Sequence, residues 1–306
     1  MTRPAWILAV TLALVACGPG VAVPGAVQGA PAVDGGAQNG SPAQNATPAP
    51  LPPELAKAES QPAAPGVTGP SYIVMEAGSG RVLLAHRSVE RRAPASLTKV
   101  MTALMVLERG RLDDIVTVDQ SVKSLENTES MLVGLLPGDQ ISVRDLLYGV
   151  LLWSGNDAAL VLARHAAGSE EAFVNLMNKR ATEMGLVDTR FANTHGLDAR
   201  NHYSTAYDLA RLARLAMQNQ TFRDMVATPN RHFTVSGEQY FMYNQNALLQ
   251  SYTGADGVKI GFTDNAGQTI IGSAIRDGRR LLVVVLGSKN RWADAMALLD
   301  LGFGYR

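Results

Sequence analysis

A serine and a lysine stand three positions apart at the start of an apolar segment, in the run Ser96-Leu97-Thr98-Lys99. Apolar residues recur at helical spacing beyond it, which predicts a helix over 96–108 with both side chains on one face, one turn apart. A serine hydroxyl attacks a carbonyl carbon when a neighbouring base takes its proton, and lysine is such a base when burial or nearby cations lower its pKa. Taken alone, this pattern is more often an N-cap serine followed by a solvated lysine.

Two later segments place polar side chains where a ligand could approach. Ser154-Gly155-Asn156 lies between two apolar segments, so a tight turn there can hold both polar side chains at one edge of a cleft; the alternative is a connecting turn that caps the next helix. Further on, Asp256-Gly257-Val258-Lys259-Ile260-Gly261 places a lysine on an expected strand that runs into a glycine, where backbone can approach a ligand closely. Neither segment identifies a site by itself.

In this order, the three segments resemble the S-x-x-K, S-x-N and K-T-G elements of penicillin-binding proteins and serine β-lactamases. The resemblance extends over residues 71–306 and implies the DD-peptidase/β-lactamase-like fold. Longer sequence segments around these elements are similar to those of one branch, the low-molecular-mass D-alanyl-D-alanine carboxypeptidases. These segments are Ala95–Lys99, Ser154–Asp157, Asn193–Leu197 and Asp256–Lys259, followed by Ala266-Gly267.

The resemblance implies a role for each matching residue. Ser96 would attack the carbonyl of the penultimate D-alanine to form an acyl-enzyme, and Lys99 would accept its proton and later activate water. Ser154 would pass a proton towards the leaving D-alanine, and Asn156 would hydrogen-bond the substrate backbone. Lys259 would supply positive charge to the terminal carboxylate and help to lower the pKa of Lys99. The implied substrates are peptidoglycan stem pentapeptides, and the implied inhibitors are β-lactam antibiotics.

The third element contributes the rest of the implied substrate site. The backbone N–H of Phe262 would complete an oxyanion hole with that of Ser96, and Gly261 and Thr263 would contact the substrate. One residue departs from the family, because Ile260 stands where the family has threonine. The threonine hydroxyl helps to bind the substrate carboxylate, and a hydrogen bond to a charged group contributes about 1.5–3 kcal/mol. Ile260 therefore predicts slower turnover, by roughly 10- to 100-fold, or a shifted substrate preference, unless Thr263 compensates.

Two other functions stay open at this point. A serine β-lactamase would need a carboxylate base for deacylation. Two carboxylates, Glu170 and Glu171, follow Ser169, but they suit the first turn of a helix better than the role of a base. A penicillin-binding fold that recognises stem peptides without turnover is the second alternative, and Ile260 is its only support in the sequence. Penicillin labelling and D-alanine release would separate the three functions.

Strand patterns occur at both ends of the folded part, and helical patterns fill the middle. Gly78-Ser79-Gly80 predicts one turn between strands, and Asp277-Gly278 predicts a tight hairpin. This order favours an α+β domain with one antiparallel sheet built from both chain ends and helices packed around it. The expected strands are 71–76, 81–85, 231–235, 239–243, 257–262, 268–276 and 279–286, and the expected helices are 96–108, 142–153, 157–167, 169–184, 205–218 and 292–301.

The first 70 residues have the composition of an export signal and a tether. Residues 1–17 carry one positive charge and an apolar run too short to span a bilayer, and they end in Leu14-Val15-Ala16-Cys17, which resembles a bacterial lipobox. An ordinary signal peptide with an incidental cysteine is the alternative. Residues 18–70 are rich in Ala, Pro and Gly without any aromatic residue, which predicts a disordered tether. The catalytic domain would then be 71–306, in an extracytoplasmic lipoprotein held on the membrane by lipid at Cys17.

The composition limits the partners, metals and cofactors that the protein is expected to bind. Lys+Arg and Asp+Glu are balanced at 27 each, which argues against a polyanionic partner such as nucleic acid. The five histidines are scattered without metal-ligand spacing, so we expect no metal and no cofactor. His195 falls in the Asn193–Leu197 segment, where we expect a structural or cleft-lining role. Cys17 is the only cysteine, as suits a domain exported without disulfides.

Overall fold

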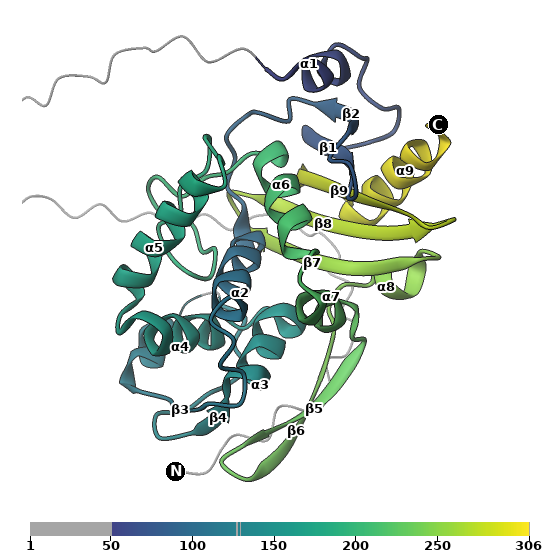
Figure 1. Cartoon of the computed structure of the whole chain (residues 1–306). Helices are drawn as coiled ribbons and strands as arrows, with labels where there is room; N and C mark the ends of the chain where they lie inside the picture. The colour runs from purple at the N-terminus through teal and green to yellow at the C-terminus, as the bar shows by residue number, and fades with distance from the viewer. Residues whose placement is uncertain (1–50, 127, 129, 306) are drawn as a thin grey trace, which may run out of the picture. The chain divides into compact units, whose positions relative to one another are not determined.

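A five-stranded antiparallel sheet forms the centre of the domain (Figure 1). The computed structural model describes residues 51–126, 128 and 130–305. The strand order β2-β1-β9-β8-β7 places the first two strands of the domain beside its last three, which confirms the α+β class and the sheet built from both chain ends. The five strands are β1 (Ser71–Glu76), β2 (Val82–His86), β7 (Ala255–Thr263), β8 (Gly267–Arg276) and β9 (Arg279–Ser288).

Side chains alternate between two cores, one on each face of this sheet. Ile73 and Met75 of β1 pack in a core shared with the helical block, while Tyr72 and Val74 pack in a second core shared with the last helix, α9 (Arg291–Gly304). Because helices cover both faces, β1 and β9 are nearly continuous apolar runs and do not alternate with polar residues.

The helical block surrounds one central helix, α2 (Lys99–Leu107), in which every residue is buried. The expected helices form within a few residues of their predicted ends, and the Ser142 hydroxyl accepts the Asp145 N–H at the start of α3, as that spacing predicted. Besides α2, the block consists of α3 (Val143–Tyr148), α4 (Asn156–Ala167), α5 (Glu170–Glu183), α6 (Ala206–Ala216), α7 (Gln220–Ala227), and the short turns η1 (Ala95–Thr98), η2 (Gln120–Leu125) and η3 (Gly149–Trp153).

Several elements differ from the sequence expectation. The strands predicted at 231–235 and 239–243 form as β5 (Asn230–Val235) and β6 (Glu238–Tyr243), but they pair only with each other and do not join the central sheet. The helix predicted over 142–153 changes at Gly149 into the π-helical turn η3. Elements that sequence reasoning missed are α7, the short helix α8 (Leu248–Ser251) and the small hairpin of β3 (Ile115–Thr117) and β4 (Gln140–Ser142).

A helix before the sheet, α1 (Pro53–Glu59), occupies the end of the expected tether. Its Leu55 side chain is 1% exposed, and the Glu59 carboxylate accepts the Ser88 N–H at 2.7 Å. The folded domain therefore includes α1, which corrects the predicted start at residue 71. Residues 60–70 are also part of the described domain, where the main-chain nitrogens of Thr68 and Gly69 donate to the Asp294 carboxylate at 2.9 Å. Residues 18–50 of the expected tether, the signal segment and Cys17 lie outside the described residues. Within the described part of the chain, no helix has the length and apolar character needed to cross a bilayer.

Candidate active site

Ser96 lies in the turn η1, directly before the central helix begins at Lys99. Lys99 Nζ is 2.9 Å from Ser96 Oγ, so the pair predicted from the sequence is in contact. Lys99 is fully buried, because α2 packs between α4 and α6 and carries the lysine into the core with its apolar residues. The sequence pattern thus produces a lysine without access to bulk water beside a serine hydroxyl.

Two further oxygen atoms surround the Lys99 amine. Asn156 Oδ1 lies 2.6 Å from Nζ, and the main-chain oxygen of His195 lies 2.5 Å from it. Both atoms are acceptors only, so they orient two N–H bonds of the amine. A neutral amine has two N–H bonds and one lone pair, and the remaining neighbour is the Ser96 hydroxyl. The lone pair can therefore accept the hydroxyl proton, as a lysine general base requires.

The electrostatic surroundings favour this neutral form. Burial lowers the pKa of Lys99 well below its usual value, the positive charge of Lys259 lowers it further, and Asp157 opposes both effects. Lys259 is itself 1% exposed, and burial together with the Arg291 guanidinium lowers its pKa to about 7. Lys99 is therefore available as a base far below the pH at which an exposed lysine loses its proton.

The turn after η3 brings Ser154 and Asn156 to the same cleft because Ser154 adopts a left-handed conformation, with φ 70°. The Asn156 amide directs its oxygen to the lysine amine and donates from Nδ2 to Ser130 Oγ at 3.0 Å. The buried Asp157 carboxylate anchors the turn by accepting main-chain N–H bonds from residues 133–135 at 2.9–3.0 Å. Sequence reasoning missed Ser130 and the 133–135 contact.

β7 is an edge strand of the sheet, and it passes the nucleophile at Gly261. A Cβ at Gly261 would lie 2.8 Å from the Ser96 backbone nitrogen and 2.7 Å from Thr269 Oγ1, so glycine is needed for this close approach. Lys259 Nζ donates to the main-chain oxygen of Ile260 at 3.0 Å. The outer edge of such a strand has backbone groups that can pair with an extended peptide.

The hydroxyl of Thr263, the residue expected to compensate at position 260, has two hydrogen-bond partners within the protein. Its Oγ1 donates to Asp198 at 2.9 Å and accepts the Ala266 N–H at 3.0 Å, so its proton is already engaged. Ile260 lines the cleft and packs, partly buried, against the core shared with α9. The cleft therefore presents an apolar side chain at this position.

These elements enclose a cleft of about 250 Å³, and Lys99 and Lys259 are buried beside it. A larger hollow of about 800 Å³ lies at the other end of β8, by the Asp277-Gly278 turn, but it contains none of the predicted site residues.

Among the described residues, no group of three or more His, Cys, Asp or Glu side chains is placed to hold a metal ion. The cleft is lined by Ser96, Met131, Ser154, Asn156, Gly196, Leu197, Gln245, Ile260, Gly261, Phe262, Thr263 and Arg291.

Arg291 is the cleft residue with the clearest chemical role that sequence reasoning missed. It begins α9, and its guanidinium donates to the main-chain oxygen of Gly261 at 2.7 Å and to Gln268 Oε1 at 3.3 Å. Burial lowers its pKa to about 10, so it is charged at neutral pH and can attract a carboxylate. No spacing rule signals this residue, because only the packing of α9 behind the sheet brings it to β7.

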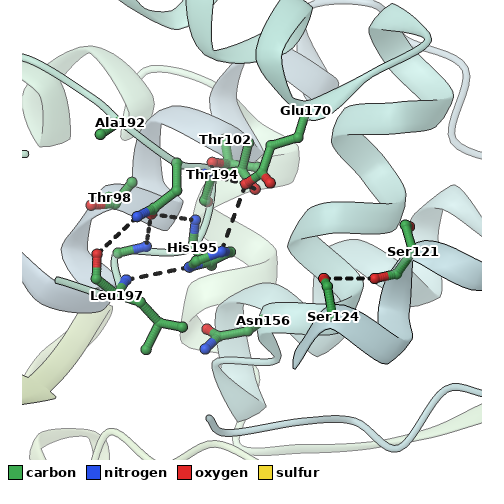
Figure 2. Close-up of polar contacts among 12 residues, drawn as sticks. Thr98, Thr102, Ser121, Ser124, Asn156, Glu170, Ala192, Thr194, His195 and Leu197 are labelled. Carbon is green, nitrogen blue, oxygen red and sulfur yellow. Dashed lines mark hydrogen bonds and ion pairs between the residues drawn. The ribbon is translucent and has the colours of Figure 1, made fainter. Parts of the chain in front are cut away.

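The Asn193–Leu197 segment forms another part of the cleft wall, through Gly196 and Leu197. A Cβ at Gly196 would collide with the main-chain oxygen of Ala95, so this segment also fits closely against η1. His195 is 7% exposed, and burial lowers its pKa to about 3, which keeps the ring neutral. Its contribution to the site is the main-chain oxygen that accepts from Lys99 (Figure 2 shows the surrounding polar contacts).

The family model described as D-alanyl-D-alanine carboxypeptidase matches residues 56–290. The chain belongs to the D-alanyl-D-alanine carboxypeptidase family. Within the family, it is 36% identical over 243 residues to D-alanyl-D-alanine carboxypeptidase DacF of Bacillus subtilis. The aligned residues cover 76% of this chain and 61% of that protein. It is 37% identical over 260 residues to D-alanyl-D-alanine carboxypeptidase DacB2 of Mycobacterium tuberculosis. The aligned residues cover 81% of this chain and 88% of that protein.

Solved structures of the family share the fold. A D-alanyl-D-alanine carboxypeptidase from Mycobacterium tuberculosis superposes with a TM-score of 0.75 at 35% identity, over 80% of this chain and 96% of that one. A Streptomyces DD-transpeptidase superposes with a TM-score of 0.75 at 33% identity, over 78% of this chain and 98% of that one. The chain spans about three fifths of the length of the first curated relatives it matches, 61% for DacF and 64% for DacC of Escherichia coli.

Proposed function

We propose that this chain is a serine-type D-alanyl-D-alanine carboxypeptidase that removes the terminal D-alanine from peptidoglycan stem pentapeptides. The observation that carries the proposal is the contact of Ser96 Oγ with the buried amine of Lys99, whose other two neighbours are acceptors only. Lys99 takes the hydroxyl proton while Oγ bonds to the carbonyl carbon of the penultimate D-alanine. The amide C–N bond then breaks, the leaving amine gains a proton, and an ester joins the peptide to Ser96.

Ser154 is the proposed route for the proton that reaches the leaving amine. It lines the cleft, and within the described residues its hydroxyl has no hydrogen-bond partner in the protein. In the second half-reaction a water molecule attacks the ester carbonyl and Lys99 accepts one of its protons. The bond between the carbonyl carbon and Ser96 Oγ breaks, and Oγ regains a proton, which releases the shortened peptide.

Two sets of groups would recognise the substrate. The main-chain N–H groups of Ser96 and Phe262 form the proposed oxyanion hole, in which each donor contributes about 3 kcal/mol to lowering the barrier. Lys259 and Arg291 supply positive charge for the terminal carboxylate, and the outer edge of β7 pairs with the extended peptide. A β-lactam presents an amide carbonyl and a carboxylate to the same groups, so we expect it to acylate Ser96 and inhibit the enzyme.

We also propose that the chain is an extracytoplasmic lipoprotein, tethered to the membrane by lipid on Cys17. The support is the sequence of residues 1–17 and the cell-wall substrate of the proposed reaction. Such an anchor would hold the domain at the membrane surface, close to its peptidoglycan substrate. No described residue bears on this part of the proposal.

Release of D-alanine from a synthetic peptide ending in D-Ala-D-Ala tests the proposed reaction. Wild type should release D-alanine, and Ser96→Ala should release none, because it lacks the attacking oxygen. Ser79→Ala is a suitable control, because Ser79 lies in the exposed turn between β1 and β2, and its release should equal that of wild type. Rapid hydrolysis of the antibiotic would favour a β-lactamase, and a stable adduct without D-alanine release would favour a binding protein.

A further inference from the structure

A carboxylate beside the cleft has no part in the chemistry proposed above. Glu170 stands in the first turn of α5, but Ser169 caps this helix, because its hydroxyl accepts the Ala172 N–H at 3.0 Å. Glu170 Oε1 instead accepts two hydrogen bonds from Thr194, one from the main-chain nitrogen at 3.0 Å and one from the hydroxyl at 2.8 Å (Figure 2). Glu170 is not part of the cleft lining, so it influences the site through the residues that it contacts, Thr194 first among them.

Thr194 is held from two sides. It is fully buried, and its main-chain oxygen accepts a hydrogen bond from the Thr102 hydroxyl of α2 at 2.7 Å. Glu170 of α5 and Thr102 of α2 therefore fix one residue between them. The next residue in the chain is His195, whose main-chain oxygen is 2.5 Å from Lys99 Nζ. A shift of Thr194 must move that oxygen and change the orientation of the lysine amine.

The His195 ring also faces Glu170. Its Nδ1 accepts the Leu197 N–H at 3.3 Å, which assigns the ring proton to Nε2, at 3.7 Å from Glu170 Oε1. Both the ring and the main-chain atoms at the start of this segment are thus arranged around one carboxylate. Leu197 itself lines the cleft, so the same contacts also place part of the cleft wall.

We propose that Glu170 is a positioning residue: by accepting both hydrogen bonds of Thr194, it holds the main-chain oxygen of His195 against Lys99. The inference rests on the proposed function, in which Lys99 is the base. Loss of the carboxylate leaves two buried donors of Thr194 without an acceptor, a state that proteins avoid by rearranging. The segment would then shift, and water would enter beside the lysine amine.

Acylation by a fluorescent penicillin, followed against pH in rapid mixing, tests the proposal with three variants. Glu170→Ala removes both acceptors, whereas Glu170→Gln keeps an oxygen that can accept from Thr194 and removes only the charge. Glu171→Ala is the matched control, because Glu171 is the exposed neighbour in the same helical turn. Thermal unfolding of each variant shows whether a loss of rate is only a loss of folded protein.

We expect Glu170→Ala to acylate about 10- to 100-fold more slowly than wild type, as a misplaced catalytic group does. Its rate should also rise at higher pH than that of wild type, because water beside Lys99 removes the burial that chiefly lowers its pKa. Glu170→Gln should stay within a few-fold of wild type, and Glu171→Ala should match it. A purely structural role would lower the melting temperature without moving the pH profile.

Hydrogen exchange of the backbone amides in residues 193–197 gives a second readout that does not depend on catalysis. We expect faster exchange there in Glu170→Ala and wild-type exchange in Glu170→Gln. If wild type itself is not labelled by penicillin, the proposed function fails, but the exchange result still decides whether Glu170 holds the segment. The inference is overturned if Glu170→Ala keeps the wild-type pH profile and exchange, or if it slows only deacylation, as loss of a hydrolytic base would.

Discussion

At the scale of single residues, the protonation states of two buried lysines decide when the proposed reaction can proceed. Lys99 must be neutral to accept the Ser96 proton, and its lowered pKa extends the neutral form to lower pH than in an exposed lysine. Lys259 must be charged to attract a carboxylate, and its pKa of about 7 means that the charge is lost as the pH rises through this value. The two requirements oppose each other, and they define a window of pH.

The first prediction is a bell-shaped pH profile for the second-order rate of acylation, which reports the free enzyme. The rate should rise with pH as Lys99 loses its proton and fall near pH 7 as Lys259 loses its own. In Lys259→Met, the cation that helps to lower the pKa of Lys99 is absent, so the rising limb should move to higher pH and the falling limb should disappear. An unchanged rising limb in this variant would show that the two lysines are not coupled.

Position 260 gives a second prediction at this scale. In Ile260→Thr, a hydroxyl would face the cleft beside Lys259, and one hydrogen bond to the substrate carboxylate corresponds to roughly a 10- to 100-fold gain in D-alanine release. Ile260→Val is the matched control, since valine has the shape of threonine without its hydroxyl. Equal release by both variants and wild type would mean that the isoleucine does not limit carboxylate recognition.

At the scale of elements, the site depends on how closely β7 approaches η1. The third prediction is that Gly261→Ala lowers penicillin acylation by at least about tenfold, because the new methyl group must displace the Ser96 backbone and Thr269. Gly304→Ala, whose Cβ would meet nothing within 4 Å, is the control for the extra methyl group. Wild-type acylation in Gly261→Ala would show that β7 can retreat without disturbing the nucleophile.

The elements of the site differ in how far they can be predicted from the sequence. The Ser96–Lys99 pair, the Ser154 turn and the Lys259 strand were predictable because helical spacing, turn composition and strand pattern are local properties. The contacts of Arg291 with Gly261 and of Glu170 with Thr194 were not predictable. Their partners lie 30 and 24 positions apart in the sequence, and tertiary packing alone brings them together. Helix α1 was missed for a similar reason, since its sequence is rich in the residues of a tether and tertiary contacts of Leu55, Ala58 and Glu59 stabilise it.

At the scale of the whole molecule, the proposed lipid anchor determines where the enzyme is found. The fourth prediction is that the full chain, expressed in a bacterium with lipoprotein processing, incorporates labelled fatty acid and sediments with membranes. Cys17→Ser should lose both the label and the sedimentation while keeping penicillin labelling, because the contact of Ser96 with Lys99 is unchanged. Membrane association of Cys17→Ser without fatty acid would contradict the anchor and point to attachment through another segment.

The central claim, that Ser96 is the acylated nucleophile and Lys99 activates it, is tested most directly by mapping the penicillin adduct. Trypsin cleaves after Arg92 and after Lys99, so Ser96 is the only serine in the peptide 93–99. Mass spectrometry of the treated protein should show one added penicillin, carried by this peptide in wild type and absent in Ser96→Ala and Lys99→Ala. An adduct on any other peptide, or full labelling of Lys99→Ala, would contradict the account.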